Sequence, residues 1–161
     1  MIEVKAPNAY TVDRPVIFLG GAIEQGKAEN WQERVVNALT ELNVIFLNPR
    51  RDDWDSSWVQ SIEDHRFRQQ VEWELAGQDL ANLCIYVFGS DEEQAKLTKA
   101  PVTLLELGLQ AKTQQVLVCC PKGYYRKGNI DIVCKKYNVP LYENLNDLIG
   151  AIRTKFSTRR Y

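Results

Sequence analysis

The sequence predicts an α/β fold in which a five-stranded parallel sheet lies between two layers of helices. Short, uninterrupted apolar runs recur along the chain, as in strands that are buried on both faces, and stretches with apolar residues at helical spacing separate them. The length of 161 residues suits one domain, and no repeat or linker divides residues 1–161. We therefore expect a single domain, a three-layer sandwich of the flavodoxin- or Rossmann-like type.

Each expected element follows from its local pattern. The strands are apolar runs that end at turn residues or polar loops, at residues 15–19, 44–47, 83–88, 115–120 and 139–142. The helices have apolar residues three and four positions apart, at residues 28–42, 62–80, 101–113, 129–137 and 145–156. The polar segment 89–100 shows no periodicity, and we expect a loop there that acts as a lid or a specificity loop.

Composition and charge exclude several classes of protein. Hydrophobic residues make up 45% of the chain and the formal net charge is −1, so neither disorder nor a general attraction to nucleic acid or to a membrane surface is expected. No apolar run reaches the roughly 18 residues of a membrane span, and the first residues do not resemble a signal peptide, so we expect a cytoplasmic protein.

Cysteine and histidine patterns argue against a metal site. The four cysteines lack metal-binding spacing, and we expect buried thiols at Cys84, Cys119, Cys120 and Cys134. The single histidine, His65, is expected on the surface of a helix. Neither G-x-G-x-x-G nor a P-loop is present, so we expect no cofactor and no metal.

Ligands of such sheets bind outside the carboxyl ends of the strands, which selects loops 20–27, 48–61 and 89–103. Gly20 and Gly21 form either a tight turn or a close backbone approach to a ligand. The second loop offers polar and aromatic groups for a phosphate, a sugar hydroxyl or a carboxylate, namely Asn48, Arg50, Arg51 and Trp54.

Two carboxylates are candidates for chemistry. Thr103 and Glu106 have capping-box spacing, so Glu106 either caps a helix or is an ionised nucleophile in its first turn. On the helix before the third strand, counting back along the strand length places residues 70–74 level with the carboxyl end of the sheet. Gln70, Trp73 and Glu74 share a face there, and Trp73 either packs in the core or stacks on a planar base.

Four segments taken together resemble the nucleoside 2-deoxyribosyltransferase-like family. They are FLGGAI (18–23), NPRRDDWD (48–55), QVEWELAGQDLAN (70–82) and TLLELGLQA (103–111), and the resemblance spans about residues 15–112. It implies a flavodoxin-like fold and a retaining mechanism in which Glu106 attacks C1′ of a 2′-deoxynucleoside. Glu74 would then contact the base and deliver a proton, and the sugar would pass to another base or to water.

The resemblance also implies the surroundings of these carboxylates. Gly20 and Gly21 would approach the sugar, and the pocket would be lined by Asn48, Arg50, Arg51, Gln70 and Trp73. The partners would be a small-molecule nucleoside and nucleobase, and the chain would form a homo-oligomer to which its end at residues 159–161 contributes. Three alternatives stay open: a nucleoside-monophosphate N-glycosidase with Thr103 near the phosphate, a non-catalytic nucleoside- or nucleotide-binding module, and a structural domain.

Overall fold

The computed structural model describes residues 1–23, 29–55 and 57–157. Its strands are β1 (Ile2–Lys5), β2 (Val16–Gly21), β3 (Ile45–Asn48), β4 (Leu83–Val87), β5 (Val116–Cys119) and β6 (Leu141–Tyr142). Its helices are α1 (Trp31–Ala38), α2 (His65–Leu80), α3 (Glu92–Leu97), α4 (Pro101–Gln110), the 3-10 turn η2 (Ala111–Thr113), α5 (Lys127–Tyr137) and α6 (Leu145–Ser157). Residues 24–27 of the first expected crevice loop, and the end at 159–161, lie outside the described residues.

The strands form one parallel sheet in the order β1-β3-β2-β4-β5-β6. The expected α/β fold is confirmed, but the expected number of five strands is wrong because β1 adds a sixth at the edge, beside β3. Without β1, the order is that of flavodoxin-like folds, whose ligand crevice lies where neighbouring strands connect in opposite directions. That point is the pair β2 and β4, which end at Gly21 and Val87.

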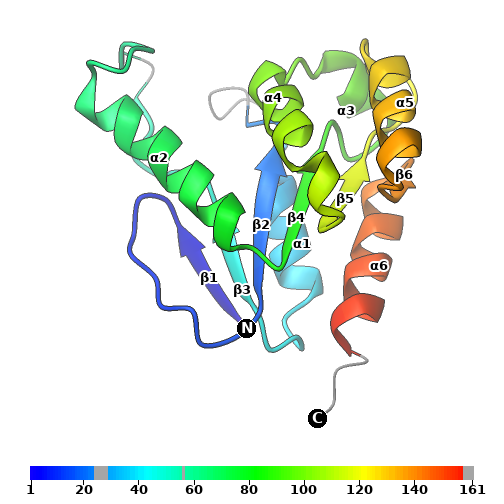
Figure 1. The fold of residues 1–161 in the computed structure, drawn as a ribbon, viewed down its shortest axis with the longest axis horizontal. Coiled ribbons are helices and arrows are strands. Elements are labelled where there is room, and N and C mark those ends of the chain that lie inside the picture. The colour runs from blue at the N-terminus through cyan, green and yellow to red at the C-terminus, as the bar shows by residue number, and fades with distance from the viewer. Residues whose placement is uncertain (24–28, 56, 158–161) are drawn as a thin grey trace.

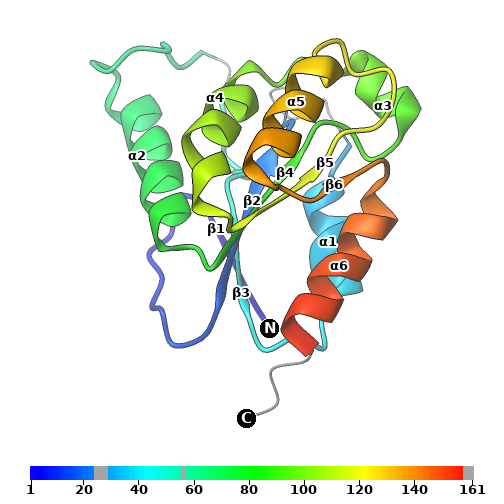
Figure 2. The same ribbon diagram turned by 45° about the vertical axis from the view of Figure 1, so that its right-hand side comes forward.

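Helices cover both faces of the sheet (Figures 1 and 2). Alternate residues of each strand enter two separate cores, as expected for strands buried on both sides. Phe18 and Tyr86 belong to the core beneath α4 and α5, whereas Leu19 and Ile85 belong to the core beneath α1 and α6. The candidate carboxylates lie on α2 and α4, on the same side as Tyr86.

The segment 89–100 contains a helix, so the expectation of a loop throughout is wrong. Helix α3 begins after Asp91, whose side chain accepts a hydrogen bond from the backbone N–H of Gln94. Ala95 is fully buried, and a Cβ added to Gly89 would lie 2.6 Å from the backbone nitrogen of Ala95. Close packing of this kind fixes the short helix against the end of β4.

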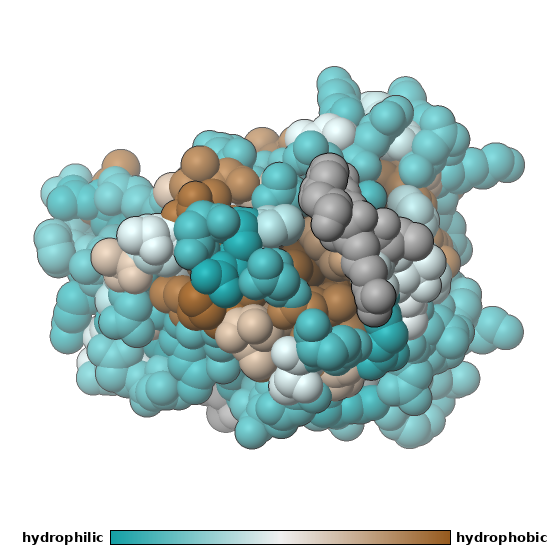
Figure 3. Space-filling model, turned by 90° about the horizontal axis from the view of Figure 1, so that it is seen from below, coloured by the Kyte–Doolittle hydropathy of each residue, from teal (hydrophilic) through white to brown (hydrophobic). Residues whose placement is uncertain are grey.

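Two further expectations are confirmed. All four cysteines are buried and free, and His65 is exposed as the first residue of α2. Within the described ranges, no helix is both long and apolar enough to cross a membrane. Seen from below, where the strands begin, the surface is mainly hydrophilic with a hydrophobic band across its middle (Figure 3).

Candidate active site

Glu106 lies in the second turn of α4, which begins at the expected residue. Pro101 is its first residue, a position that suits proline since no N–H is needed there. Ala100 precedes it in the left-handed conformation, with φ 44°, and no side chain caps the helix. Thr103 is therefore buried inside the first turn, and the predicted capping box with Glu106 in the first turn is wrong.

A buried hydrogen-bond chain holds the carboxyl group of Glu106. Only 7% of the residue is exposed, and its Oε1 accepts a hydrogen bond of 2.8 Å from Nε2 of Gln78 on α2. Oε1 of Gln78 in turn accepts a hydrogen bond of 2.6 Å from the hydroxyl of Tyr86 on β4. Among the described residues, the hydrogen bond that Glu106 accepts is to Oε1 and comes from Gln78.

Glu74 lies one turn along α2 from Gln78 and has the same type of partner. Nε2 of Gln70 donates to Oε1 of Glu74 (2.7 Å) and to the backbone oxygen of Pro49 (2.9 Å). Because Pro49 directly follows β3, this contact confirms that Gln70 is level with the carboxyl end of that strand. Gln70, Glu74 and Gln78 are four residues apart and therefore form one row along α2.

The two carboxyl groups are protonated far more readily than ordinary glutamates. Burial raises the pKa of Glu74 to about 7, although the hydrogen bond from Gln70 opposes the change. Burial, and then the negative charge of Glu74, raise the pKa of Glu106 to about 8. The prediction that a helix terminus keeps Glu106 ionised is therefore wrong, because removal of water outweighs the helix dipole.

Contacts within the protein account for both glycines at the end of β2. A Cβ on Gly20 would lie 2.6 Å from two ring carbons of Tyr86, and one on Gly21 would lie 2.6 Å from the ring of Trp31. Gly21 also has a φ of +154°, which side chains rarely adopt. The glycines thus admit aromatic rings on opposite faces of the sheet, and their predicted approach to a sugar stays a prediction.

The loop after β3 is held together by its own side chains. Nδ2 of Asn48 donates to the carboxylate of Glu3 on β1 (2.7 Å), and Oδ1 of Asn48 accepts from the backbone N–H of Arg50 (2.9 Å). The guanidinium of Arg50 donates to the backbone oxygen of Glu29, and burial lowers its pKa. Asn48 and Arg50 therefore fix the loop to the sheet and to the segment before α1.

Arg51 and Trp54 come together on Trp58. The guanidinium of Arg51 pairs with Asp53 through two hydrogen bonds of 2.8 and 2.9 Å and lies 4.7 Å from the ring centre of Trp58. The rings of Trp54 and Trp58 are 5.0 Å apart. Nη1 of Arg51 and Nε1 of Trp54 are buried without a partner in the part of the chain that the structure describes.

Trp73 packs against the segment that links β1 to β2. Its Nε1 donates to the backbone oxygen of Asn8 (2.9 Å), and its ring meets that of Tyr10 edge to face at 5.9 Å. These contacts favour the core-packing alternative for Trp73 over stacking on a base.

Comparison with known families agrees with this arrangement. The sequence model of the nucleoside 2-deoxyribosyltransferase-like family matches residues 14–124, more than two thirds of the chain. The protein belongs to this family. A comparison with curated proteins finds no match. The family match covers β2, β3, β4 and the helices that carry both carboxyl groups, so Glu74 and Glu106 lie within the family domain.

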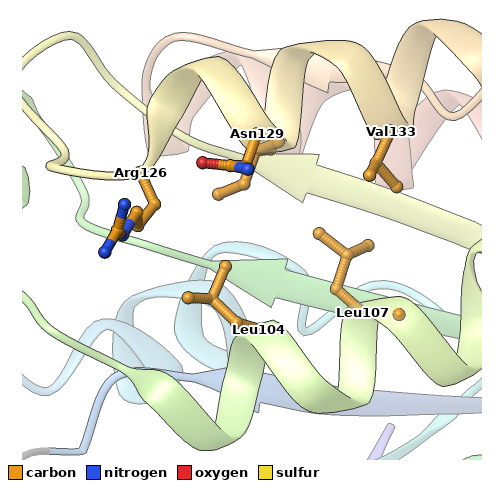
Figure 4. Close-up of a pocket in the computed structure, with 7 residues that line it drawn as sticks. Leu104, Leu107, Arg126, Asn129 and Val133 are labelled. Carbon is orange, nitrogen blue, oxygen red and sulfur yellow. The ribbon is translucent and has the colours of Figure 1, made fainter.

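The described part of the chain has two cavities whose linings include neither Glu74 nor Glu106. One, of about 330 Å³, separates α4 from α5, where Leu104 and Leu107 face Asn129 and Val133 with Arg126 at one end (Figure 4). The other, of about 600 Å³, is lined by residues 3–8 and by Asp52 and Asp53. Within the described residues, no group of three or more histidine, cysteine or acidic side chains could hold a metal ion.

Sequence reasoning missed Gln78 and Tyr86, whose hydrogen bonds form the chain that ends at the carboxyl group of Glu106. Gln78 had a usable signal, because it lies four residues after Glu74 and therefore on the same side of the helix. Tyr86 had none, since its hydroxyl belongs to an apolar strand and meets α2 only in the folded chain.

Proposed function

We propose that this chain cleaves the N-glycosidic bond of 2′-deoxynucleosides through a covalent glycosyl–Glu106 intermediate and passes the sugar to another base or to water. The observation that carries the proposal is the pair of carboxyl groups, buried at Glu106 and half-buried at Glu74, each with one oxygen held by a glutamine of α2. Glu74 lies one helical turn from Gln78 on α2, and the amide of Gln78 contacts Glu106. Family membership supports nucleosides as the class of substrate.

The reaction needs the two groups in opposite protonation states. Oε2 of Glu106, as a carboxylate, attacks C1′, and the bond from C1′ to the base nitrogen breaks with its electron pair on that nitrogen. The proton of Glu74 goes to the departing base. A second base, or water, then attacks C1′, gives a proton back to Glu74 and releases Glu106 as a carboxylate.

Substrate binding favours this distribution of protons. In the free protein, the pKa is raised to about 8 for Glu106 and to about 7 for Glu74, so the proton favours Glu106 until a substrate binds. A base nitrogen that accepts a hydrogen bond from Glu74 stabilises the protonated form of that group. Glu106, held by the N–H of Gln78, then carries the negative charge.

The test is chromatography of each of the four 2′-deoxynucleosides after incubation with the protein, with and without a free acceptor base. A new nucleoside that forms only with acceptor shows transfer, and free base without acceptor shows hydrolysis. Glu106→Gln should abolish both, whereas Glu72→Gln, an exposed change on α2, should not. If the nucleosides stay intact and the monophosphates react, the substrate is the phosphorylated form.

The role of Glu74 is tested with two kinds of leaving group. Glu74→Gln should slow release of a natural base by about 10²- to 10⁴-fold, the usual effect of losing a general acid. A 2-deoxyriboside of a nitrophenol needs no proton to leave, so the variant should react with it at nearly the wild-type rate. Equal losses with both substrates would contradict proton delivery by Glu74, and thermal stabilisation by nucleosides without any product would indicate a binding module.

A further inference from the structure

Three elements meet at the carboxyl group of Glu106. The hydroxyl of Tyr86 on β4 donates to Oε1 of Gln78 on α2, and Nε2 of Gln78 donates to Oε1 of Glu106 on α4. Tyr86 is fully buried and Gln78 is 2% exposed. Water therefore does not compete for either hydrogen bond, and both are stronger than they would be at the surface.

The sheet fixes the place of the Tyr86 hydroxyl. Gly20 on β2 is the direct neighbour of Tyr86 on β4, and a Cβ at Gly20 would lie 2.6 Å from two carbons of the Tyr86 ring. The ring occupies the space that any side chain at position 20 would need. Its hydroxyl is thus set by two paired strands, independently of the helices that carry Gln78 and Glu106.

The direction of the hydrogen bonds matters for the charge of Glu106. Because the Tyr86 hydroxyl donates to Oε1 of Gln78, the amide presents Nε2 to Glu106. An N–H donor stabilises a carboxylate more than a neutral carboxyl group. If the amide of Gln78 were turned over, its Oε1 would face Glu106 and its Nε2 would face Tyr86. That orientation would suit a protonated Glu106, which would donate to Oε1 of Gln78 while Nε2 of Gln78 donated to the oxygen of Tyr86.

We infer that Tyr86 and Gln78 are positioning residues for Glu106, which favour its ionised form and hold Oε1 so that Oε2 faces the substrate. The inference rests on the proposed function for the identity of the reaction. Tyr86 acts only through Gln78, because it is bonded to the amide and not to the carboxyl group.

The other ionisable groups around Glu106 do not supply this effect. The negative charge of Glu74 on α2 opposes ionisation of Glu106. On β4, burial raises the pKa of Cys84 to about 12 and that of Tyr86 above its ordinary range, so both stay neutral. Among the described residues, the amide of Gln78 is the donor that favours the Glu106 carboxylate.

The experiment compares Tyr86→Phe, Gln78→Leu and the double variant with the wild type. The pKa of Glu106 is measured by NMR on protein with ¹³C-labelled glutamate carboxyls, and Glu106→Gln assigns the signal. Gln78→Leu should raise this pKa by about one unit or more and lower kcat about tenfold to hundredfold, with little change in KM. Tyr86→Phe should act in the same direction by a smaller amount, and the double variant should match Gln78→Leu.

Tyr124→Phe is the matched control, because it removes a tyrosine hydroxyl that donates to the backbone oxygen of Lys99. It should leave the Glu106 titration unchanged. The inference is overturned if Gln78→Leu and Tyr86→Phe also leave that titration unchanged, or if their effects multiply in the double variant. The NMR titration needs no substrate, so absence of turnover in the wild type would refute the proposed function and not this inference.

Discussion

Replacing Glu106 by glutamine should stabilise the protein at alkaline pH and change its stability little at pH 5. Glutamine has nearly the same shape but no charge, and it can still accept the hydrogen bond from Gln78. The carboxyl group that it replaces is 7% exposed, and its pKa is raised from 4.5 to about 8 by burial and by Glu74. The variant therefore removes the cost of a buried charge without opening a cavity.

The sign and size of the stability difference between Glu106→Gln and the wild type follow from proton linkage. Between pH 4.5 and about 8, unfolded chains release a proton that the native protein keeps, so the wild type loses stability as pH rises through this window. The full shift corresponds to roughly 5 kcal/mol at 1.36 kcal/mol per pKa unit. Water that enters beside the ionised group makes the real effect smaller than this upper limit. We expect the free energy of unfolding of Glu106→Gln to exceed that of the wild type by about 2–4 kcal/mol at pH 9 and by about 1 kcal/mol or less at pH 5.

The assay is urea unfolding followed by the fluorescence of the four tryptophans, at five pH values from 5 to 9. Glu72→Gln is the control, because the Glu72 side chain is 69% exposed on the same helix as Glu74. Its difference from the wild type should not change with pH. A Glu106→Gln difference that is equal at pH 5 and pH 9 would refute the assignment of a buried, uncharged carboxyl group.

Two further predictions concern other buried groups. Asn48→Ala should lower the free energy of unfolding, measured in urea, by about 1–3 kcal/mol, because the carboxylate of Glu3 and the N–H of Arg50 lose a buried partner. A large rise in KM with an unchanged free energy of unfolding would instead favour a direct contact between Asn48 and the substrate. The four cysteine thiols should react with a disulfide reagent at pH 8 only after denaturation, since burial protects them and raises their pKa to between about 11 and 12. Rapid reaction of the native protein would contradict the burial of these cysteines.

The sequence was sufficient for the central strands and their order along the chain. Strands such as β2 and β4 are buried on both faces, so nearly every residue is apolar and the run is visible without a structure. Strand β1 was missed because it lies at the sheet edge and pairs only with β3. Its sequence, IEVK, includes two exposed residues and shows no apolar run.

Local motifs gave the wrong answer where a neighbouring residue competed. Thr103 and Glu106 have the spacing of a capping box, but Pro101 starts α4 two residues earlier. Segment 89–100 is polar and short, and the six residues of α3 are too few for a visible period. In both cases the deciding signal was a single residue, Pro101 for α4 and the capping Asp91 for α3.

The sequence by itself determined the parallel α/β fold, the family, and the helices on which Glu74 and Glu106 lie, because these depend on patterns that are local in the chain. Only the tertiary structure decided that Glu106 is buried and bonded to Gln78, with Tyr86 behind it. The affinity of a carboxyl group for its proton depends on how much water surrounds it and which charges and donors face it. Those neighbours come from α2, β4 and β2, and they meet only when the chain has folded.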